Sequence, residues 1–309
     1  MSRQTASYLR GLFARRGISP RHRYGQNFLI DLNLHDVIVR EAELTSEDVV
    51  LEVGPGAGAL TQRLAREAAA VVAVEIDPAM AGLTAEATAE MTNVQVIHCD
   101  ILAGKHAIDA GVLGALETAL AAGAGRRLKL VANLPFQVAT PLIVDLLYEV
   151  PGPLVPVCMV ATIQKEVADR LVAPAASHSY GALSALVGAV ADVEILRVLP
   201  PTVFWPRPKV DSAIVRMKPR PERRANVPDL AWYHEVVRRL FQHRRKHVRV
   251  AVLASWRDQF DKSTIDELLA SVDLSGQLRA ESLDPTELID LASALKTALA
   301  KGESDQTAR

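Results

Sequence analysis

The sequence has little cysteine and no long uncharged apolar run. Two cysteines occur among 309 residues, Cys99 and Cys158, and both lie in apolar stretches. So few cysteines exclude a disulfide framework and a zinc site, and they are typical of a reducing compartment. No run of about 18 apolar residues is free of charge and proline, so no membrane span is expected. The N-terminus lacks the apolar core of a signal peptide, so we expect a cytoplasmic protein. We also expect that the protein needs no metal.

Net charge is also almost absent, at −1, but the charges are segregated along the chain. Residues 1–30 hold six arginines and no acid, namely Arg3, Arg10, Arg15, Arg16, Arg21 and Arg23. Residues 197–224 hold eight Lys or Arg against two acids, and residues 238–249 hold six against none. Residues 258–309 reverse this balance, with eleven acids against five bases. Three separate acid-poor stretches favour a polyanion as partner.

Short β-branched runs alternate with helical stretches from residue 49 onward. Strands are expected at 49–53, 71–76, 94–99, 128–133 and 155–162, followed by two more at 193–199 and 210–217. Strands separated by helical crossovers predict an α/β fold with a parallel, doubly wound sheet, whose ligands bind at the carboxyl ends of the strands. The insert 103–127 is expected to contain a helix with loose ends.

Two domains are expected from a chain of this length, at about 150 residues per domain. We place an N-terminal arm and the α/β domain in residues 1–223. A small all-α domain follows in residues 224–309, and the stretch RRLFQHRRKHVR (238–249) is expected to be helical within it. The tail after Lys301 is predicted to be disordered.

A glycine-rich segment, Glu52-Val53-Gly54-Pro55-Gly56-Ala57-Gly58, ends the first strand. Glycines here let the backbone approach a ligand closely. The spacing also fits the loose dinucleotide pattern, with Glu75 at a suitable distance, so by itself it leaves NAD and S-adenosylmethionine open. Glu52 favours the second, because a carboxylate attracts a cationic amino group and repels a pyrophosphate.

Three acids end three successive strands: Glu52, Glu75 and Asp100. The carboxylate of Glu75 can accept hydrogen bonds from both hydroxyls of a ribose, and Asp100 can accept one from the exocyclic amine of an adenine. Together they would line one edge of the sheet with acceptors. This arrangement suits a nucleoside that carries a cationic amino-acid tail better than it suits a dinucleotide.

The fourth strand ends in Asn133-Leu134-Pro135-Phe136, which resembles the signature of methyltransferases that modify the exocyclic amine of adenine. Seven further segments resemble, in the same order, the KsgA/RsmA family of ribosomal RNA adenine dimethyltransferases. They are GQNFLID, EVGPGAGALT, QKEVADRLVA, SYGALS, FWPRPKVDSAIVRM, FQHRRKHVR and RAESL. The resemblance covers nearly the whole chain, and eight ordered motifs are far more specific than any one of them.

This resemblance implies a Rossmann-like methyltransferase of class I that uses S-adenosylmethionine. Its expected activity is dimethylation of two adjacent adenines in the 3′-terminal hairpin loop of 16S rRNA, during assembly of the 30S subunit, by a monomeric protein. The implied cofactor contacts are Gln26, Asn27, Leu29, Glu52, Gly54, Gly56, Glu75, Asp100 and Asn133. The expected RNA contacts are Phe136, Phe204, Lys209, Arg244, Arg245, Lys246 and Arg249.

The chemistry expected of the tetrapeptide follows from the electronic structure of adenine. The amine on carbon 6 is a poor nucleophile because its lone pair is delocalised into the ring. The side-chain oxygen of Asn133 and the carbonyl of Leu134 can accept hydrogen bonds from this amine. Pro135 fixes the turn that orients the Leu134 carbonyl. Phe136 can stack on the base, although it stands where tyrosine is usual and lacks a hydroxyl.

The sequence is also compatible with two other functions. A large-subunit rRNA methyltransferase of the resistance type would share the chemistry, but Leu134 and the segments QKEVADRLVA and RAESL favour the small-subunit branch. A non-catalytic RNA-binding assembly factor would share the fold, but the presence of Glu75, Asp100 and Asn133 argues against it.

Overall fold

The computed structural model describes residues 5–21, 24–104 and 107–307, so Arg3 and Arg23 of the N-terminal basic stretch lie outside the described residues. The chain forms two compact units. The first comprises Met1–Ala168 and Val193–Pro219, and the second comprises Asp169–Asp192 and Arg220–Arg309. This division differs from the predicted boundary at 223/224 mainly because the segment Asp169–Asp192 groups with the C-terminal helices.

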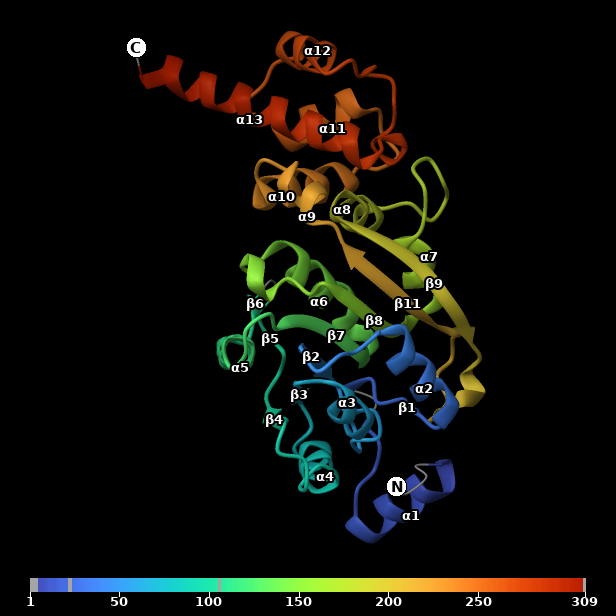
Figure 1. The fold of residues 1–309 in the computed structure, drawn as a ribbon. Helices are drawn as coiled ribbons and strands as arrows, with labels where there is room; N and C mark the ends of the chain where they lie inside the picture. Colours follow the sequence, from blue (N-terminus) through green and yellow to red (C-terminus); the bar gives the residue numbers. More distant parts are fainter. Residues whose placement is uncertain (1–4, 22–23, 105–106, 308–309) are drawn as a thin grey trace. The chain divides into compact units, whose positions relative to one another are not determined.

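A seven-stranded sheet underlies the fold, in the order β4-β3-β2-β7-β8-β11-β9 (Figure 1). Its strands are β2 (Asp48–Val53), β3 (Ala70–Glu75), β4 (Val94–His98), β7 (Arg127–Asn133), β8 (Cys158–Gln164), β9 (Ala191–Leu199) and β11 (Ser212–Pro219). Strands β4, β3, β2, β7 and β8 are parallel, and β11 runs antiparallel to β8. The predicted α/β class is therefore confirmed, with an antiparallel strand added to the parallel part.

The helices of the first unit cover both faces of this sheet. They are α1 (Ala6–Arg16), α2 (Leu32–Glu41), α3 (Thr61–Glu67), α4 (Pro78–Ala87), α5 (Ala110–Ala121) and α6 (Phe136–Tyr148), and α7 (Lys165–Leu171) follows β8. On one face, Ile38 of α2 and Leu64 of α3 pack in a cluster with Val50. The neighbouring side chains Val49 and Leu51 point to the opposite face and are also fully buried. Helices α5 and α6 contact the same sheet. Burial on both faces explains the uninterrupted apolar run of β2.

The insert 103–127 contains the expected helix, α5, preceded by a short antiparallel strand pair, β5 (Leu102–Gly104) and β6 (Ala107–Ile108). Asp109 starts the helix, because its carboxylate accepts hydrogen bonds from the backbone N–H groups of Gly111 and Val112.

The N-terminal arm is a helix packed beside the glycine-rich segment. Thr5 caps α1 by accepting a hydrogen bond from the backbone of Tyr8, and Gly17 ends it in a left-handed conformation. Leu9 and Phe13 are buried in a cluster with Met80 of α4. Phe13 also lies edge-on to Phe28, with ring centroids 5.4 Å apart.

A short antiparallel ladder holds the segment that follows the arm. Strand β1 (Phe28–Leu29) pairs with β10 (Phe204–Trp205), so that Phe28 lies opposite Trp205 and Leu29 opposite Phe204. The ladder joins the GQNFLID and FWPRP motifs, which are far apart in the sequence. Asp31 then caps α2, where its carboxylate accepts a hydrogen bond from the backbone of Asn33.

A buried ion pair lies at the amino-terminal ends of β2 and β7. Lys129 is 5% exposed and Asp48 is fully buried. The Lys129 ammonium lies 2.9 Å from a carboxylate oxygen of Asp48 and donates to the backbone carbonyls of Ala42 and Glu43. Arg127 donates to the other oxygen of Asp48 at 2.7 Å. Lys129 is the only strongly buried lysine among the described residues, and this network provides partners for its charge and its N–H groups.

Replacement of Lys129 by methionine is expected to lower the free energy of unfolding by about 3–5 kcal/mol, because it leaves the Asp48 carboxylate buried with one cation fewer. Burial raises the pKa of Asp48, but hydrogen bonds from Arg127, Lys129 and Thr45 outweigh burial and lower it. The stabilisation by this network is therefore present above the unfolded pKa of 3.8 and is lost as the pH falls below it. Urea unfolding at pH 7 and pH 3 tests both points. The double variant K129M/D48N is expected to recover part of the loss, and a loss unchanged by the second substitution would contradict the pairing.

The second unit is helical within its described residues. Its helices are α8 (Ala182–Val190), α9 (Pro221–Ala225), α10 (Leu230–Phe241), α11 (Val248–Ser255), α12 (Lys262–Ser271) and α13 (Pro285–Thr307). Buried Tyr233 of α10 donates a hydrogen bond to the carbonyl of Ala185 in α8, which ties the segment Asp169–Asp192 to the C-terminal helices. The backbone of α13 is helical to Thr307, so the tail predicted to be disordered after Lys301 begins inside a helix.

The single helix expected over residues 238–249 is wrong. Helix α10 ends at Phe241, and α11 begins at Val248. The backbone N–H groups of Val248 and Arg249 donate to the carbonyls of Leu278 and Gly276 instead of to carbonyls one turn earlier. Pairing with this distant segment breaks the helix, so residues 242–247 form a loop between α10 and α11.

Candidate active site

A cavity of about 170 Å³ lies in the first unit, at the carboxyl ends of the parallel strands. Every residue predicted to contact the cofactor or to act in catalysis lines it, and so does Phe204. Residues contributed by β1, by the loops after β2, β3, β4 and β7, and by α2 meet there. The cavity therefore lies where the topology rule for parallel sheets predicts that ligands bind.

The glycine-rich segment forms one wall of the cavity. Gly54 and Gly56 have φ angles of 75° and 62°, a left-handed conformation that disfavours other residues. A Cβ atom at Gly56 would lie 2.9 Å from the ring of Phe28, and one at Gly54 would lie 3.1 Å from Pro135. These two positions therefore need glycine both for backbone conformation and for close packing against the facing wall.

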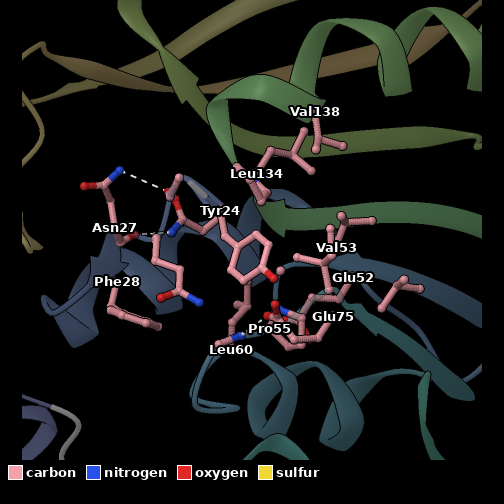
Figure 2. Close-up of a pocket in the computed structure, with 18 of the residues that line it drawn as sticks. Tyr24, Asn27, Phe28, Glu52, Val53, Pro55, Leu60, Glu75, Leu134 and Val138 are labelled. Carbon is pink, nitrogen blue, oxygen red and sulfur yellow. Dashed lines mark hydrogen bonds between the residues drawn. The ribbon is translucent and has the colours of Figure 1, made fainter. Parts of the chain in front are cut away.

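Glu52 lies at the inner side of this wall, near the end of β2 (Figure 2). Its side chain is 1% exposed, and one carboxyl oxygen, Oε2, has no hydrogen-bond partner among the described residues. Burial raises the pKa of Glu52 to about 8. An unpaired buried carboxyl beside a cavity indicates a ligand that brings a hydrogen-bond donor or a positive charge.

Glu75 and Asp100 lie at the ends of the next two strands along the sheet edge. The two carboxylate oxygens of Glu75 accept hydrogen bonds from the backbone of Gly56 at 3.2 Å and of Asp77 at 3.0 Å. Burial raises the pKa of Glu75 above its usual value. Asp100 is exposed and accepts from the backbone of Leu102. Both carboxylates are therefore positioned by local backbone and border the cavity.

The segment before β1 closes the cavity on the opposite side. The Gln26 amide bridges two protein groups: it accepts from the backbone of Arg21 at 2.7 Å and donates to Asp77 at 3.0 Å. The side chain of Asn27 donates to the carbonyl of Gly25. These contacts explain the local conformation of GQNFL, whereas a direct contact of Gln26 with a cofactor stays a prediction.

Asn133 joins this segment to the fourth parallel strand in the sheet. Its side-chain nitrogen Nδ2 donates to the backbone carbonyl of Asn27 at 2.9 Å. This contact uses one of the two N–H groups of the amide and orients the side chain, whose oxygen Oδ1 can accept a hydrogen bond from a ligand. The backbone N–H of Leu134 donates to Thr162 of β8 at 3.1 Å, and Pro135 stands at the N-terminus of α6. The turn that follows Asn133 is thus held on both sides.

Aromatic side chains also line the cavity. Phe136 begins α6 and is partly exposed, as a stacking residue would need to be. Phe204 lines the cavity but is only 2% exposed and belongs to the apolar cluster that includes Leu29. The ring of Tyr24 points between Leu134 and Pro55 (Figure 2). Sequence reasoning missed Tyr24, although its aromatic character just before GQNFL could have marked it.

His35 and Leu9 are two further cavity residues that sequence reasoning missed. His35 is 4% exposed, and burial, followed by the charge of Arg63, lowers its pKa to about 4. Nothing in the pattern LNLHDVIV separates a cavity histidine from a core residue. Leu9 reaches the cavity only because α1 folds back over the first unit, which no local pattern predicts.

The predicted RNA-binding cations differ in how they are held within their own units. Lys209 is exposed in the first unit. In the second unit, Arg245 and Lys246 are exposed, and no described residue forms an ion pair with either. Arg244 donates to the carbonyl of Tyr180 and lies 3.7 Å from Glu281. Arg249 makes two hydrogen bonds to Asp266. Among the predicted cations of the second unit, Arg245 and Lys246 are therefore the most available for contact with RNA.

Among the described residues, no group of three or more His, Cys, Asp or Glu side chains is arranged to hold a metal ion. None of the helices in the described part of the chain is both long and apolar enough to span a bilayer.

Known proteins resemble this chain over most of its length. A family model for ribosomal RNA adenine dimethylases matches residues 17–290. "Ribosomal RNA small subunit methyltransferase A" of Leuconostoc citreum is 40% identical over 282 residues, which are 91% of each chain. The protein of the same name from Pelotomaculum thermopropionicum is 39% identical over 285 residues, covering 92% of this chain and 94% of the other.

A solved structure supports the fold independently. The dimethyladenosine transferase of Plasmodium falciparum aligns with a TM-score of 0.70 and 23% identity, covering 87% of this chain and 97% of the other. With the family model, the curated relatives and a cavity lined by all four residues of the NLPF segment, the resemblance seen in the sequence is confirmed: the chain belongs to the ribosomal RNA adenine dimethylase family.

Proposed function

We propose that this protein transfers methyl groups from S-adenosylmethionine to the N6 amines of two adjacent adenines in the 3′-terminal hairpin loop of small-subunit rRNA. The observation that carries the proposal is the position of Asn133, which lines the cavity and whose side chain is fixed by a hydrogen bond to Asn27. The curated relatives are named for the small subunit, which favours that substrate over the large subunit.

The cavity residues fit S-adenosylmethionine. Glu52 offers an unpaired buried oxygen for the ammonium group, and Glu75 offers carboxylate oxygens for the ribose hydroxyls. Asp100, which lines the cavity, would accept a hydrogen bond from the adenine amine of the cofactor. Gly54 and Gly56 leave space that a Cβ atom would fill. When bound, the cofactor supplies an electrophilic methyl group on a sulfonium sulfur.

The chain's own contribution to the chemistry lies in the turn 133–136. The Asn133 oxygen and the Leu134 carbonyl accept hydrogen bonds from the two N–H groups of the adenine amine. These hydrogen bonds favour the tetrahedral geometry of the nitrogen. Alignment of this amine with the methyl donor supplies much of the acceleration. Phe136 offers a ring for stacking, worth about 1–3 kcal/mol per base. The methylated amine loses its proton readily, so no strong base is needed.

A paired adenine cannot reach a cavity at the edge of the sheet, so the target must be unpaired or turned out of its stack. A hairpin loop meets this requirement. Two transfers to one nitrogen also require that the monomethylated amine turn and bind again.

Mass spectrometry of rRNA tests the proposed function directly. Small subunits from cells that lack this methylation are incubated with the protein and S-adenosylmethionine, and large subunits serve as the parallel control. We expect two adjacent dimethyladenines in small-subunit RNA alone. Methylation confined to large subunits would assign the protein to the resistance type, and binding without any transfer would assign it to non-catalytic assembly.

The exposed loop cations are expected to bind phosphates. We predict that the double variant R245A/K246A weakens binding to small subunits and makes the slope of log K against log salt shallower by about 0.7–0.9 for each phosphate that is no longer bound. Affinity for the cofactor is expected to stay unchanged, because neither residue lines the cavity. Filter binding over a series of salt concentrations measures the slope.

A matched control is available in the same unit. Arg257 and Lys262 are also exposed, and they lie beyond the opposite end of α11 from the loop 242–247. The double variant R257A/K262A removes the same charge. Equal weakening by the two double variants would show a general charge effect and contradict a specific contact at Arg245 and Lys246.

A further inference from the structure

One buried histidine borders the cavity and has no part in the chemistry described above. His35 of α2 is 4% exposed and lines the cavity. Its Nδ1 atom is enclosed and has no hydrogen-bond partner among the described residues. Buried polar atoms in folded proteins are almost always hydrogen-bonded. A partner outside the polypeptide is therefore expected at this position.

The same cavity contains a second unpaired buried atom of complementary type. Oε2 of Glu52 comes from β2, on a different element from His35, and is equally enclosed. A carboxylate accepts hydrogen bonds and attracts positive charge, whereas a neutral imidazole always carries one N–H that it can donate. An amino-acid group carries an ammonium and a carboxylate on one carbon, so it would satisfy both atoms.

The surroundings of His35 keep its imidazole neutral. The guanidinium of Arg63 is close enough to lower the pKa of His35, after burial, and is itself held by Asp36 at 2.8 Å and by the carbonyl of Ala59 at 3.1 Å. Asp36 and Asp31 act in the opposite direction. The imidazole is thus neutral at neutral pH, and its one N–H is available to donate to a carboxylate.

We propose that His35 is a cofactor-binding residue that donates a hydrogen bond to the α-carboxylate of S-adenosylmethionine, while Glu52 accepts one from the α-ammonium. This inference rests on the proposed function, because it requires that S-adenosylmethionine be the cofactor. It places the amino-acid end of the cofactor between α2 and the end of β2.

Calorimetric binding of three ligands tests this assignment. S-adenosylhomocysteine carries both the ammonium and the carboxylate, decarboxylated S-adenosylmethionine lacks the carboxylate, and 5′-methylthioadenosine lacks both groups. The variant H35L removes the donor at similar volume. We expect its affinity for S-adenosylhomocysteine to fall about tenfold or more, as for a hydrogen bond to a charged group. Its affinities for the other two ligands are expected to stay within about twofold, within the spread of near-neutral substitutions.

Two further measurements keep the test decisive. The variant H35Q retains an N–H donor and is expected to bind S-adenosylhomocysteine more tightly than H35L does. Thermal unfolding without ligand is expected to show H35L at least as stable as the parent, because it removes an unpaired buried polar atom. An equal loss for all three ligands, or no loss, would overturn the role of His35. Failure of the parent protein to bind S-adenosylhomocysteine would instead overturn the proposed function.

Discussion

Replacement of Asn133 by alanine is expected to reduce methyl transfer to small subunits by a factor on the order of 10²–10³ or more, as for loss of a group that stabilises a transition state. The substitution removes Oδ1, the proposed acceptor of a hydrogen bond from the adenine amine. It also removes the hydrogen bond to the Asn27 carbonyl at 2.9 Å. Cofactor affinity is expected to stay within a few-fold, because Glu52, Glu75 and Asp100 are unchanged.

Single-turnover rates at saturating cofactor measure the effect of N133A without interference from binding or product release. The variant N133D is the matched control, since it keeps an acceptor oxygen while it loses the donor to Asn27 and gains a negative charge. We expect its rate to lie between those of N133A and the parent. Intact turnover by N133A would refute the mechanism proposed for the turn 133–136.

Replacement of Glu52 by glutamine is expected to stabilise the empty protein and to weaken cofactor binding. Burial raises the pKa of Glu52 from 4.5 to about 8, so the unfolded chain loses this proton at lower pH than the folded protein does. The free energy of unfolding therefore falls as the pH rises between about 4.5 and about 8. At pH 7 this cost is on the order of 3 kcal/mol, and E52Q removes it.

The gain in stability is coupled to a loss of function. An ammonium group beside Glu52 favours the ionised form of its carboxyl group. Binding of the cofactor near pH 7 is therefore expected to release a proton from the parent protein. The variant E52Q has no proton to release at this position. We expect its affinity for S-adenosylhomocysteine to fall about tenfold or more. Urea unfolding at pH 5.5, 7 and 8.5, with calorimetry in buffers of different ionisation enthalpy, measures both effects. Equal stability of E52Q and the parent at pH 8.5 would contradict an ionisable, buried Glu52.

Much of the site could be predicted because it lies where strands end. Glu75 and Asn133 are the last residues of their strands, and Glu52 precedes the last residue of β2, so a short-range pattern locates them. The geometry of parallel sheets then brings the strand ends to one edge. Backbone positions with a positive φ angle can also be recognised in the sequence, because they are usually occupied by glycine and few other residues adopt that conformation.

Features that depend on distant contacts could not be predicted in this way. His35 occupies an apolar position of an amphipathic helix, and only the fold shows that this position borders a cavity. The loop 242–247 contains no glycine or proline, and the helix breaks there because the backbone of Val248 pairs with Leu278. Likewise, Arg249 has the same local sequence character as Arg245, but only Arg249 meets an aspartate from α12.

The ladder of β1 and β10 has a consequence for the synthesis of this protein. The wall that holds Asn27 is fixed by pairing of Phe28 with Trp205, so it is complete only when both strands are available. A nascent chain that has not yet emerged as far as Trp205 can form strands β2, β3, β4 and β7 but has no partner for β1. The ability to hold a ligand in this cavity is therefore acquired late in translation, after most of the first unit has left the ribosome.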